Sequence, residues 1–189
     1  MYKRNTKRII DLFLSISGFL ILLPLSFFIY IVLFFINDGK PLFFQPRPGK
    51  NEKIFNIMKF RTMTDKTDRG GKLLPDADRL TNFGNFLRKT SLDEIPQLIN
   101  VVKGEMSLVG PRPGLPTQVE LKNEREKRHV FTSRPGITGL AQVNEVDMST
   151  PKRLSRYDAL MLKQLNLCWY FQLLLWTALG KGQGDRVKP

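Results

Sequence analysis

The strongest pattern along the chain is a long apolar stretch near its N-terminus. Residues 12–36 contain 20 apolar residues among 25 and no charged residue. As a helix this stretch would rise roughly 38 Å, enough to cross the hydrocarbon layer of about 30 Å in a bilayer. It is too long for the apolar part of a signal peptide, and no small-residue cleavage site follows Ile36. The pattern therefore predicts a membrane anchor.

Two arrangements of this anchor remain open. Pro24 lies in the middle of the run, where it removes one backbone hydrogen bond and favours a bend. Positive residues resist export, and they flank the run on both sides. Those before it are Lys3, Arg4, Lys7 and Arg8, and those after it are Lys40, Arg47, Lys50 and Lys53. A single span is one interpretation, and a re-entrant hairpin with both ends in the cytosol is the other.

The rest of the chain alternates short elements with polar loops. Aromatic and β-branched runs on either side of a turn predict a β-hairpin, and helical periodicity dominates the residues after this hairpin. The predicted segments are strands at 41–46 and 53–61, a loop at 64–79, helices at 79–89, 93–103, 117–130 and 154–179, and irregular Gly- and Pro-rich stretches at 107–116 and 132–151. The expected fold class is α+β, mainly helical, with one small hairpin.

The end of the last predicted helix carries a second apolar signal. Residues 167–179 contain 11 apolar residues among 13, including Trp169 and Trp176. Such a helix is about 20 Å long, too short to cross a bilayer. One interpretation is an amphipathic helix lying in the membrane interface beside the anchor, because aromatic rings with a polar tip favour the headgroup level. The other is a core helix, and Cys168 is expected to pack within it.

Composition narrows the chemistry. The 189 residues suit one modest catalytic domain, and 30 Lys and Arg against 17 Asp and Glu give a net charge of +13. This charge indicates anionic partners, namely nucleic acid, phosphorylated small molecules or an anionic membrane face. A single Cys and a single His, the latter expected at the surface as His129, exclude a zinc or iron site. Any metal should be a hard ion such as Mg²⁺, held by carboxylates and phosphates.

Two adjacent carboxylates, Asp93 and Glu94, are the first candidates for chemistry. A structural alternative is a helix-capping box in which Ser91 bonds to Glu94. Pro96 argues against that box, because it would remove a backbone donor in the first turns of the helix. The proline fits better if the regular helix begins at about Asp93 or Glu94. The carboxylates would then lie beside unpaired backbone N–H groups, where a phosphate can bind.

Several basic residues stand in aromatic or Gly- and Pro-rich settings, which favours phosphate binding. Arg112 is the clearest case of such a setting, since Pro111 and Pro113 fix the backbone on both sides of it. A guanidinium held in this way can bind a phosphate through two hydrogen bonds. The whole set is Lys59, Arg61, Arg88, Arg112 and Arg134.

These residues fall within motifs that resemble the bacterial sugar transferase, or monotopic phosphoglycosyl transferase, family. The motifs are KFRTM at 59–63, LRKTSLDEIPQL at 87–98, GEMSLVGPRP at 104–113 and RPGITG at 134–139. Four motifs in this order are highly specific, and the resemblance covers nearly the whole chain. Within the family the chain looks most like the transferases that open bacterial N-linked protein glycan assembly.

The resemblance implies a reaction and roles for individual residues. A sugar 1-phosphate would pass from a UDP-sugar to undecaprenyl phosphate with release of UMP, the donor expected being UDP-N,N′-diacetylbacillosamine or another UDP-N-acetylhexosamine. Asp93 would be the nucleophile of a covalent phosphosugar intermediate, and Glu94 its partner. The remaining implied site residues are Lys59, Arg88, Arg112 with Pro111 and Pro113, and Arg134 for phosphates, and Asp93, Glu94 and Glu105 for Mg²⁺.

The resemblance also implies a location. Residues 1–36 would form a re-entrant membrane helix-break-helix bent at Pro24, and residues 37–189 a catalytic domain on the cytoplasmic face of the bacterial inner membrane, in contact with anionic lipid. One departure from the family pattern is Leu23, where a serine is expected. No nucleic-acid partner is expected, because the sequence has no helix-turn-helix, finger or stacking-sheet signature. A direct transfer in a ternary complex remains the alternative mechanism.

Overall fold

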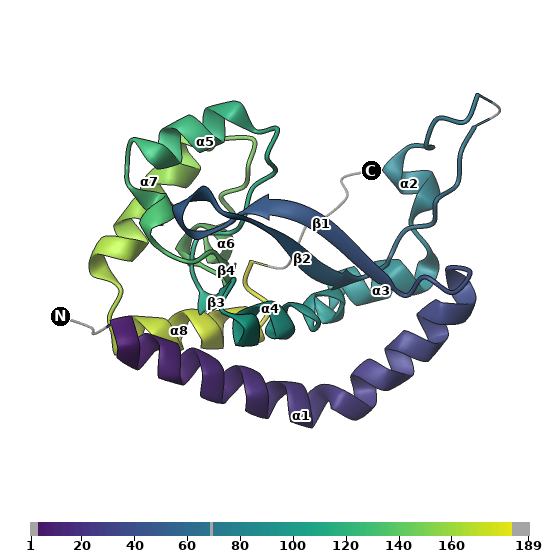
Figure 1. Cartoon of the computed structure of the whole chain (residues 1–189), viewed down its shortest axis with the longest axis horizontal. Coiled ribbons are helices and arrows are strands. Elements are labelled where there is room, and N and C mark those ends of the chain that lie inside the picture. The colour runs from purple at the N-terminus through teal and green to yellow at the C-terminus, as the bar shows by residue number, and fades with distance from the viewer. Residues whose placement is uncertain (1–3, 69, 183–189) are drawn as a thin grey trace.

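The structure is a computed structural model that describes residues 4–68 and 70–182. The elements are α1 (Arg4–Ile36), β1 (Leu42–Pro48), η1 (Lys50–Glu52), β2 (Ile54–Phe60), α2 (Asp76–Arg79), α3 (Asn82–Lys89), η2 (Leu92–Glu94), α4 (Gln97–Lys103), β3 (Ser107–Val109), α5 (Val119–Glu126), η3 (Val130–Thr132), β4 (Gly136–Thr138), α6 (Leu140–Val143), α7 (Pro151–Gln164) and α8 (Leu167–Ala178). The predicted class, mainly helical with a small hairpin, is confirmed (Figure 1). Lys3 and the end of the chain lie outside the described residues.

The predicted anchor is one long helix, α1, which runs under the whole body (Figure 1). The expected helix-break-helix is not found as an interruption, because the helix continues through Pro24 and only bends about midway. A lost hydrogen bond at one proline bends a helix without ending it when the flanking turns are intact. Among the described residues α1 is the one helix long and apolar enough to cross a membrane.

One side of α1 packs against the body. Asp11, Ser15, Ile29 and Leu33 are buried, whereas most of its other large apolar side chains are exposed. Its main neighbour is α4, and the guanidinium of Arg8 donates to the last carbonyls of α4, those of Val101 and Val102. α1 therefore lies alongside the rest of the fold instead of projecting from it.

The predicted hairpin is confirmed. β1 and β2 pair antiparallel from Leu42 opposite Phe60 to Pro48 opposite Ile54. The side chain of Asn100 on α4 joins the hairpin to the body. It accepts a hydrogen bond from the N–H of Met58 and donates one to the carbonyl of Asn56, both on β2. The end of β2 therefore lies against α4 and the turn that precedes it.

A second, parallel strand pair was not predicted. β3 and β4 pair through Ser107 with Gly136 and Val109 with Thr138, inside segments expected to be irregular. Three-residue strands are too short to show a hydrophobic period. The two segments approach so closely that a Cβ on Gly136 would lie 2.0 Å from the backbone N of Gly110, so only glycine fits at position 136.

The predicted long final helix is two helices. α7 ends at Gln164, and α8 begins after Asn166, whose side-chain oxygen accepts a hydrogen bond from the N–H of Trp169 at 2.9 Å. This cap starts a new helix in a new direction. The sequence prediction missed the break because no Gly or Pro marks it.

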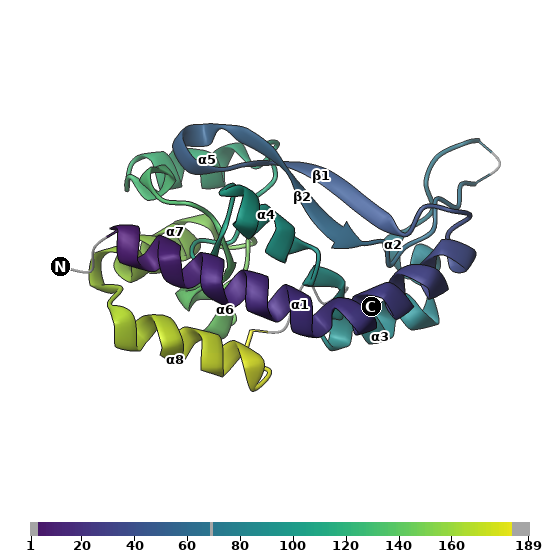
Figure 2. The ribbon, with the colours of Figure 1, turned by 60° about the horizontal axis from the view of Figure 1, so that its bottom comes forward.

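The core interpretation of the apolar helix is confirmed for one face of α8, and the interfacial interpretation stays a prediction for the other face. Tyr170 and Leu173 are buried, whereas Leu167, Phe171 and Leu175 form an exposed apolar stripe with a spacing of four residues. α8 lies beside the first half of α1 (Figure 2), and the Tyr170 hydroxyl donates to Asp11 at 2.7 Å. The prediction that Cys168 packs internally is wrong, since it is exposed. His129 is exposed, as predicted.

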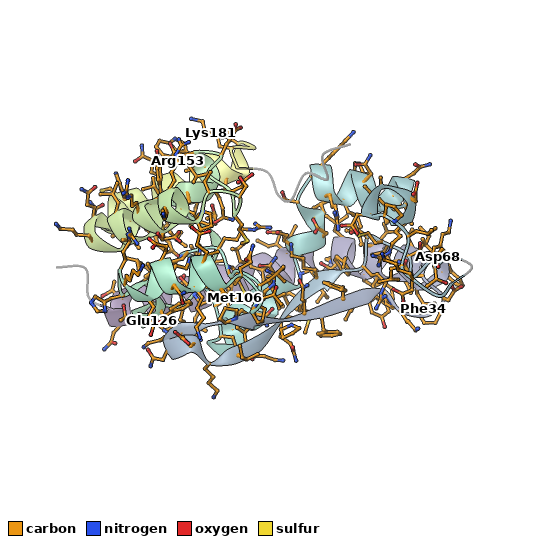
Figure 3. The ribbon with its side chains drawn as sticks, turned by 90° about the horizontal axis from the view of Figure 1, so that it is seen from above. Phe34, Asp68, Met106, Glu126, Arg153 and Lys181 are labelled. Atoms are coloured by element: carbon orange, nitrogen blue, oxygen red, sulfur yellow. The ribbon has the colours of Figure 1, made fainter. Side chains whose placement is uncertain are left out.

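The predicted loop between the hairpin and α3 contains two β-bridges and the short helix α2. We call it the arm and define it as residues 63–68 and 70–80. Its two sides are bridged at Met63 with Leu80 and at Thr67 with Leu73, and α2 lies on the returning side. Asp68 near its tip lies at the far end of the molecule from Glu126 and Arg153 (Figure 3).

Candidate active site

The two candidate carboxylates lie on a single 3-10 turn, η2, that precedes α4. Ser91 enters this turn in the left-handed region with φ of 56°, and its side chain caps nothing, so the capping-box alternative is not formed. The predicted helix start at about Asp93 or Glu94 is too early, because α4 begins at Gln97 after Pro96. The proline occupies the cap position, where no helical donor is lost.

Asp93 is buried, with 6% of its surface exposed. Burial raises the pKa of its carboxyl from 3.8 to about 6, against the opposing effect of Lys59 and with a smaller raising contribution from the charge of Glu94. Arg88 and Arg112 also act to lower the pKa. A carboxylate with these surroundings is ionised at neutral pH yet poorly hydrated, which favours it as a nucleophile.

Glu94 is held by two cations that arrive from different elements. Oε1 of Glu94 accepts from Nζ of Lys59, at the end of β2, at 2.8 Å. The same oxygen accepts from Nη2 of Arg112, in the loop after β3, at 3.2 Å. The structure thus brings together residues that are separated by up to 53 positions in the chain.

Arg112 is positioned by the proline-flanked loop, as predicted. Pro111 and Pro113 are buried, and their carbonyls accept hydrogen bonds from the N–H of Gly136 and from the guanidinium of Arg47. The parallel pair β3–β4 therefore holds the loop from one side and the hairpin holds it from the other. The loop is fixed while the Arg112 side chain reaches the dyad.

Arg88 projects from α3 toward the same site. Its Nε donates to Oγ1 of Thr62 at 2.9 Å, just beyond β2. α3 approaches this segment so closely that a Cβ on Gly84 would lie 2.1 Å from the carbonyl oxygen of Thr62. Thr62 was not singled out from the sequence, although it belongs to the KFRTM motif that carries Lys59.

Two predicted site residues lie elsewhere. Nε of Arg134 donates to the carbonyl of Gly104 at 2.7 Å, beyond the far end of α4. Glu105 is bound there too, since its Oε2 accepts from Nδ2 of Asn100 at 2.7 Å. Both residues belong to the family motifs, but α4 separates them from the dyad. Neither lines the cavity that contains Asp93.

The donor atoms fit Mg²⁺ only if a substrate completes the site. No group of three His, Cys, Asp or Glu side chains able to hold a metal occurs within residues 4–68 and 70–182. The predicted set of Asp93, Glu94 and Glu105 is therefore not assembled. Mg²⁺ is commonly bound by one or two carboxylates together with substrate phosphates. Asp93 and Glu94 fit that arrangement.

A polar cavity of about 400 Å³ opens in front of the dyad. It is enclosed by the hairpin, the arm and the dyad turn. Its lining residues are Phe43, Gln45, Arg47, Lys59, Phe60, Arg61, Thr62, Met63, Asp65, Leu73, Asp76, Arg79, Arg88, Asp93 and Glu94. Sequence reasoning missed the arm residues, because a polar loop gives no signal of which side chains face inward.

An apolar groove of about 520 Å³ lies on the other side of the dyad turn. It runs between α1 and the body, and Pro24 of the anchor faces Ile95 and Pro96 across it. The full lining is Phe19, Leu23, Pro24, Ser26, Phe27, Tyr30, Leu42, Met58, Phe60, Ile95, Pro96 and Ile99. Phe60 lines both cavities, and Ile95 of the groove follows Glu94 in the chain, so the polar cavity and the apolar groove both border the segment that carries the dyad.

Comparison with known proteins finds relatives that are named as sugar transferases or sugar phosphotransferases. The chain is 53% identical over 110 residues to the uncharacterized sugar transferase EpsL of Bacillus subtilis, covering 58% of this chain and 54% of the relative. It is 43% identical over 146 residues to the undecaprenyl-phosphate glucose phosphotransferase of Komagataeibacter xylinus, covering 73% and 27%. To the UDP-galactose-lipid carrier transferase of Erwinia amylovora it is 35% identical over 195 residues, covering 94% and 40%.

These three relatives are longer proteins, of which this chain spans between about a quarter and just over half. Similarity to the family as a whole extends further. Residues 2–181 match the sequence profile of the bacterial sugar transferases. That match includes the anchor, both cavities and every residue around the dyad. The chain belongs to the bacterial sugar transferase family.

Proposed function

We propose that the protein is a phosphoglycosyl transferase that moves a sugar 1-phosphate from a UDP-sugar to undecaprenyl phosphate and releases UMP. The observation that carries this proposal is the place of the dyad. Asp93 and Glu94 line a polar cavity that also contains cations, and the next residues, Ile95 and Pro96, line an apolar groove beside the anchor. A water-soluble diphosphate suits the first and a polyprenyl chain the second.

In the first step, an oxygen of Asp93 attacks the sugar-bearing phosphorus, and the bond from that phosphorus to the bridging oxygen of UMP breaks. The products are UMP and an acyl phosphate that links Asp93 to the sugar. Lys59, Arg88 and Arg112 offset the repulsion between this carboxylate and the diphosphate, because all three cations surround it. Mg²⁺, when bound between the dyad and the phosphates, would neutralise further negative charge.

In the second step, a phosphate oxygen of undecaprenyl phosphate attacks the same phosphorus and the bond to Asp93 breaks. The lipid then carries a diphosphate-linked sugar, and the carboxylate is restored. Division into two steps lets two bulky substrates use the site in turn. Glu94, held by Lys59 and Arg112, keeps these cations beside the reacting phosphate in both steps.

The apolar groove supports a polyprenyl acceptor. Its walls are almost wholly apolar, and it leads from the exposed side of α1 to Ile95, next to Glu94. The isoprenoid chain would lie along the anchor while its phosphate reaches the dyad. Burial of hydrocarbon in such a groove is favourable at roughly 25 cal/mol per Å².

The arrangement of α1 supports a monotopic location on the cytoplasmic face of the inner membrane. Its exposed apolar side and the stripe on α8 would enter the same leaflet, while its other side stays against the body. A perpendicular span would carry the polar body into the hydrocarbon, at high cost. Basic residues at both ends of α1 would meet anionic headgroups.

The donor is proposed to be a UDP-N-acetyl sugar, with UDP-N,N′-diacetylbacillosamine first among them and protein glycan assembly as the purpose. The names of two relatives specify glucose and galactose for those proteins. The test panel therefore contains UDP-N,N′-diacetylbacillosamine, UDP-N-acetylglucosamine, UDP-N-acetylgalactosamine, UDP-glucose and UDP-galactose.

The decisive experiment presents the purified chain, in detergent with Mg²⁺, with each donor in the absence of lipid. We expect one equivalent of UMP and an intact-mass increase equal to the sugar phosphate, both lost in Asp93→Asn. Undecaprenyl phosphate should then discharge the adduct. UMP release that requires the lipid, with no adduct, would favour direct transfer in a ternary complex. Failure of every donor with lipid present would refute the proposed reaction.

A further inference from the structure

The polar cavity has two ends with different charge. At the dyad end, Lys59 and Arg88 line the cavity beside two carboxylates, and Arg112 donates to one of them, Glu94. At the other end the charges cancel in pairs that involve the arm. Nη1 of Arg61 donates to both carboxylate oxygens of Asp65 at 2.9 Å. A second ion pair joins Nη1 of Arg79 to Oδ1 of Asp76 at 3.4 Å. A diphosphate is thus favoured at the dyad end, and the arm end suits an uncharged polar group.

The arm is firmly joined to the site at its base. The N–H of Thr64 donates to the carbonyl of Arg79 and Nε of Arg79 donates to the carbonyl of Thr64, each at 2.9 Å. Next to this base, Thr62 accepts the hydrogen bond from Arg88. The base of the arm therefore adjoins Thr62, the residue that positions Arg88.

Two features at the arm end match a carbohydrate. Leu73 is 52% exposed although it lines the cavity, so it offers an apolar contact to a sugar ring or an acetyl methyl group. The Asp76 carboxylate is 64% exposed in its side chain and can accept hydrogen bonds from hydroxyl groups. Neither residue is needed to close the core.

The nucleobase finds better partners elsewhere in the cavity. Uracil stacks on aromatic rings. Among the described residues that line the cavity, those from the arm include no aromatic side chain, whereas the hairpin contributes Phe43 and Phe60. With the diphosphate at the dyad and the base on the hairpin, the arm is the wall that remains for the sugar.

We propose that the arm is the sugar-recognition element of this transferase, in which Leu73 and Asp76 contact the donor's glycosyl group and set which UDP-sugar is used. The inference rests on the proposed function. It assigns the selectivity for the sugar to a segment that carries none of the residues placed at the phosphates.

The test compares two lining residues with two matched neighbours that do not line the cavity. Leu73→Ala is paired with Leu74→Ala, and Asp76→Asn with Asp78→Asn on the same short helix. For each variant, kcat/KM for UMP release is measured with the five donors and undecaprenyl phosphate, together with inhibition by free UMP.

We expect Leu73→Ala and Asp76→Asn to change the ratio of kcat/KM between the two best donors roughly tenfold, with UMP inhibition unchanged. The neighbours Leu74→Ala and Asp78→Asn should leave the ratio unchanged. An equal loss with every donor, or weaker inhibition by UMP, would overturn the inference and place the nucleoside at the arm. Absence of turnover by the unsubstituted chain would instead refute the proposed function, and the sugar subsite with it.

Discussion

Asp93 and Glu94 are chain neighbours with opposite surroundings. Asp93 is withdrawn from water, whereas Glu94 shares one oxygen between Lys59 and Arg112. Desolvation raises the pKa of the first carboxyl, and hydrogen bonds from the two cations hold the second carboxylate in place. The difference supports the proposal that Asp93 is the nucleophile and that Glu94 positions the cations.

The raised pKa of Asp93 predicts the pH dependence of adduct formation. With a pKa of about 6, ionised Asp93 falls from most of the population at pH 7 to roughly a tenth at pH 5. Single-turnover adduct formation should therefore fall about tenfold between these values. Intrinsic fluorescence at each pH controls for unfolding. A rate independent of pH from 5 to 8 would contradict this role.

The same shift predicts a stability effect. Because the folded chain holds this proton more tightly than the unfolded chain, the stabilisation is complete below pH 3.8 and is lost as the pH rises through about 6. Ionisation of Asp93 thus lowers the free energy of unfolding by up to about 3 kcal/mol at pH 7.5. Asp93→Asn should melt at a higher temperature there, with the advantage vanishing near pH 4. The exposed control Asp78→Asn should not, and a lower melting temperature for Asp93→Asn would contradict the argument.

At the scale of elements, α4 connects the chemistry with the anchor. The dyad turn precedes its first residue, Gln97, and its last carbonyls are capped by Arg8 from α1. One short helix therefore links the dyad turn to the first turns of α1. β3 and β4 complete the frame by holding the Arg112 loop.

The close contact of α3 with the end of β2 predicts the outcome of a small substitution. In Gly84→Ala the new methyl group would collide with the carbonyl of Thr62, which would move the acceptor of Arg88. Overpacking of this kind costs about 1–3 kcal/mol. We expect a lower melting temperature and at least a roughly tenfold loss of kcat for UMP release. The exposed neighbour variant Asn85→Ala should retain both properties, and normal activity in Gly84→Ala would show that Thr62 does not position Arg88.

At the scale of the whole molecule, a long apolar helix lies along a polar body. Its buried side includes Asp11, which accepts hydrogen bonds from Ser107, from the N–H of Leu108 and from Tyr170. These bonds fasten the first turns of α1 to β3 and α8. A helix bound along its length to the body has little freedom to project through a bilayer, which favours the monotopic arrangement.

This arrangement predicts the accessibility of the N-terminal end of α1. Asn5→Cys, placed in a Cys168→Ser background, should resist a membrane-impermeant maleimide in intact cells and react after permeabilisation. The reason is that a re-entrant α1 keeps residue 5 in the cytosol. A cysteine introduced at exposed Lys66 on the arm serves as the cytosolic reference. Labelling of residue 5 in intact cells would establish a single span.

The sequence by itself determined the hairpin, the long apolar helix and the adjacent carboxylates Asp93 and Glu94, because these depend on local signals: alternating strands, an apolar run and neighbouring residues in one motif. It could not determine which distant residues meet. Glu105 lies in the same motif as Arg112, and Arg134 opens the next motif, yet of these three only Arg112 reaches Glu94, because α4 lies between the others and the dyad.

Only the tertiary structure decided the parallel pair β3–β4, the break before α8 and the inward side of the arm. Each depends on contacts between segments far apart in the chain, or on a single cap such as Asn166, and neither leaves a period in the sequence. The continuous α1 is decided in the same way. A proline marks where a helix can yield, whereas the packing on either side of Pro24 sets how far it bends.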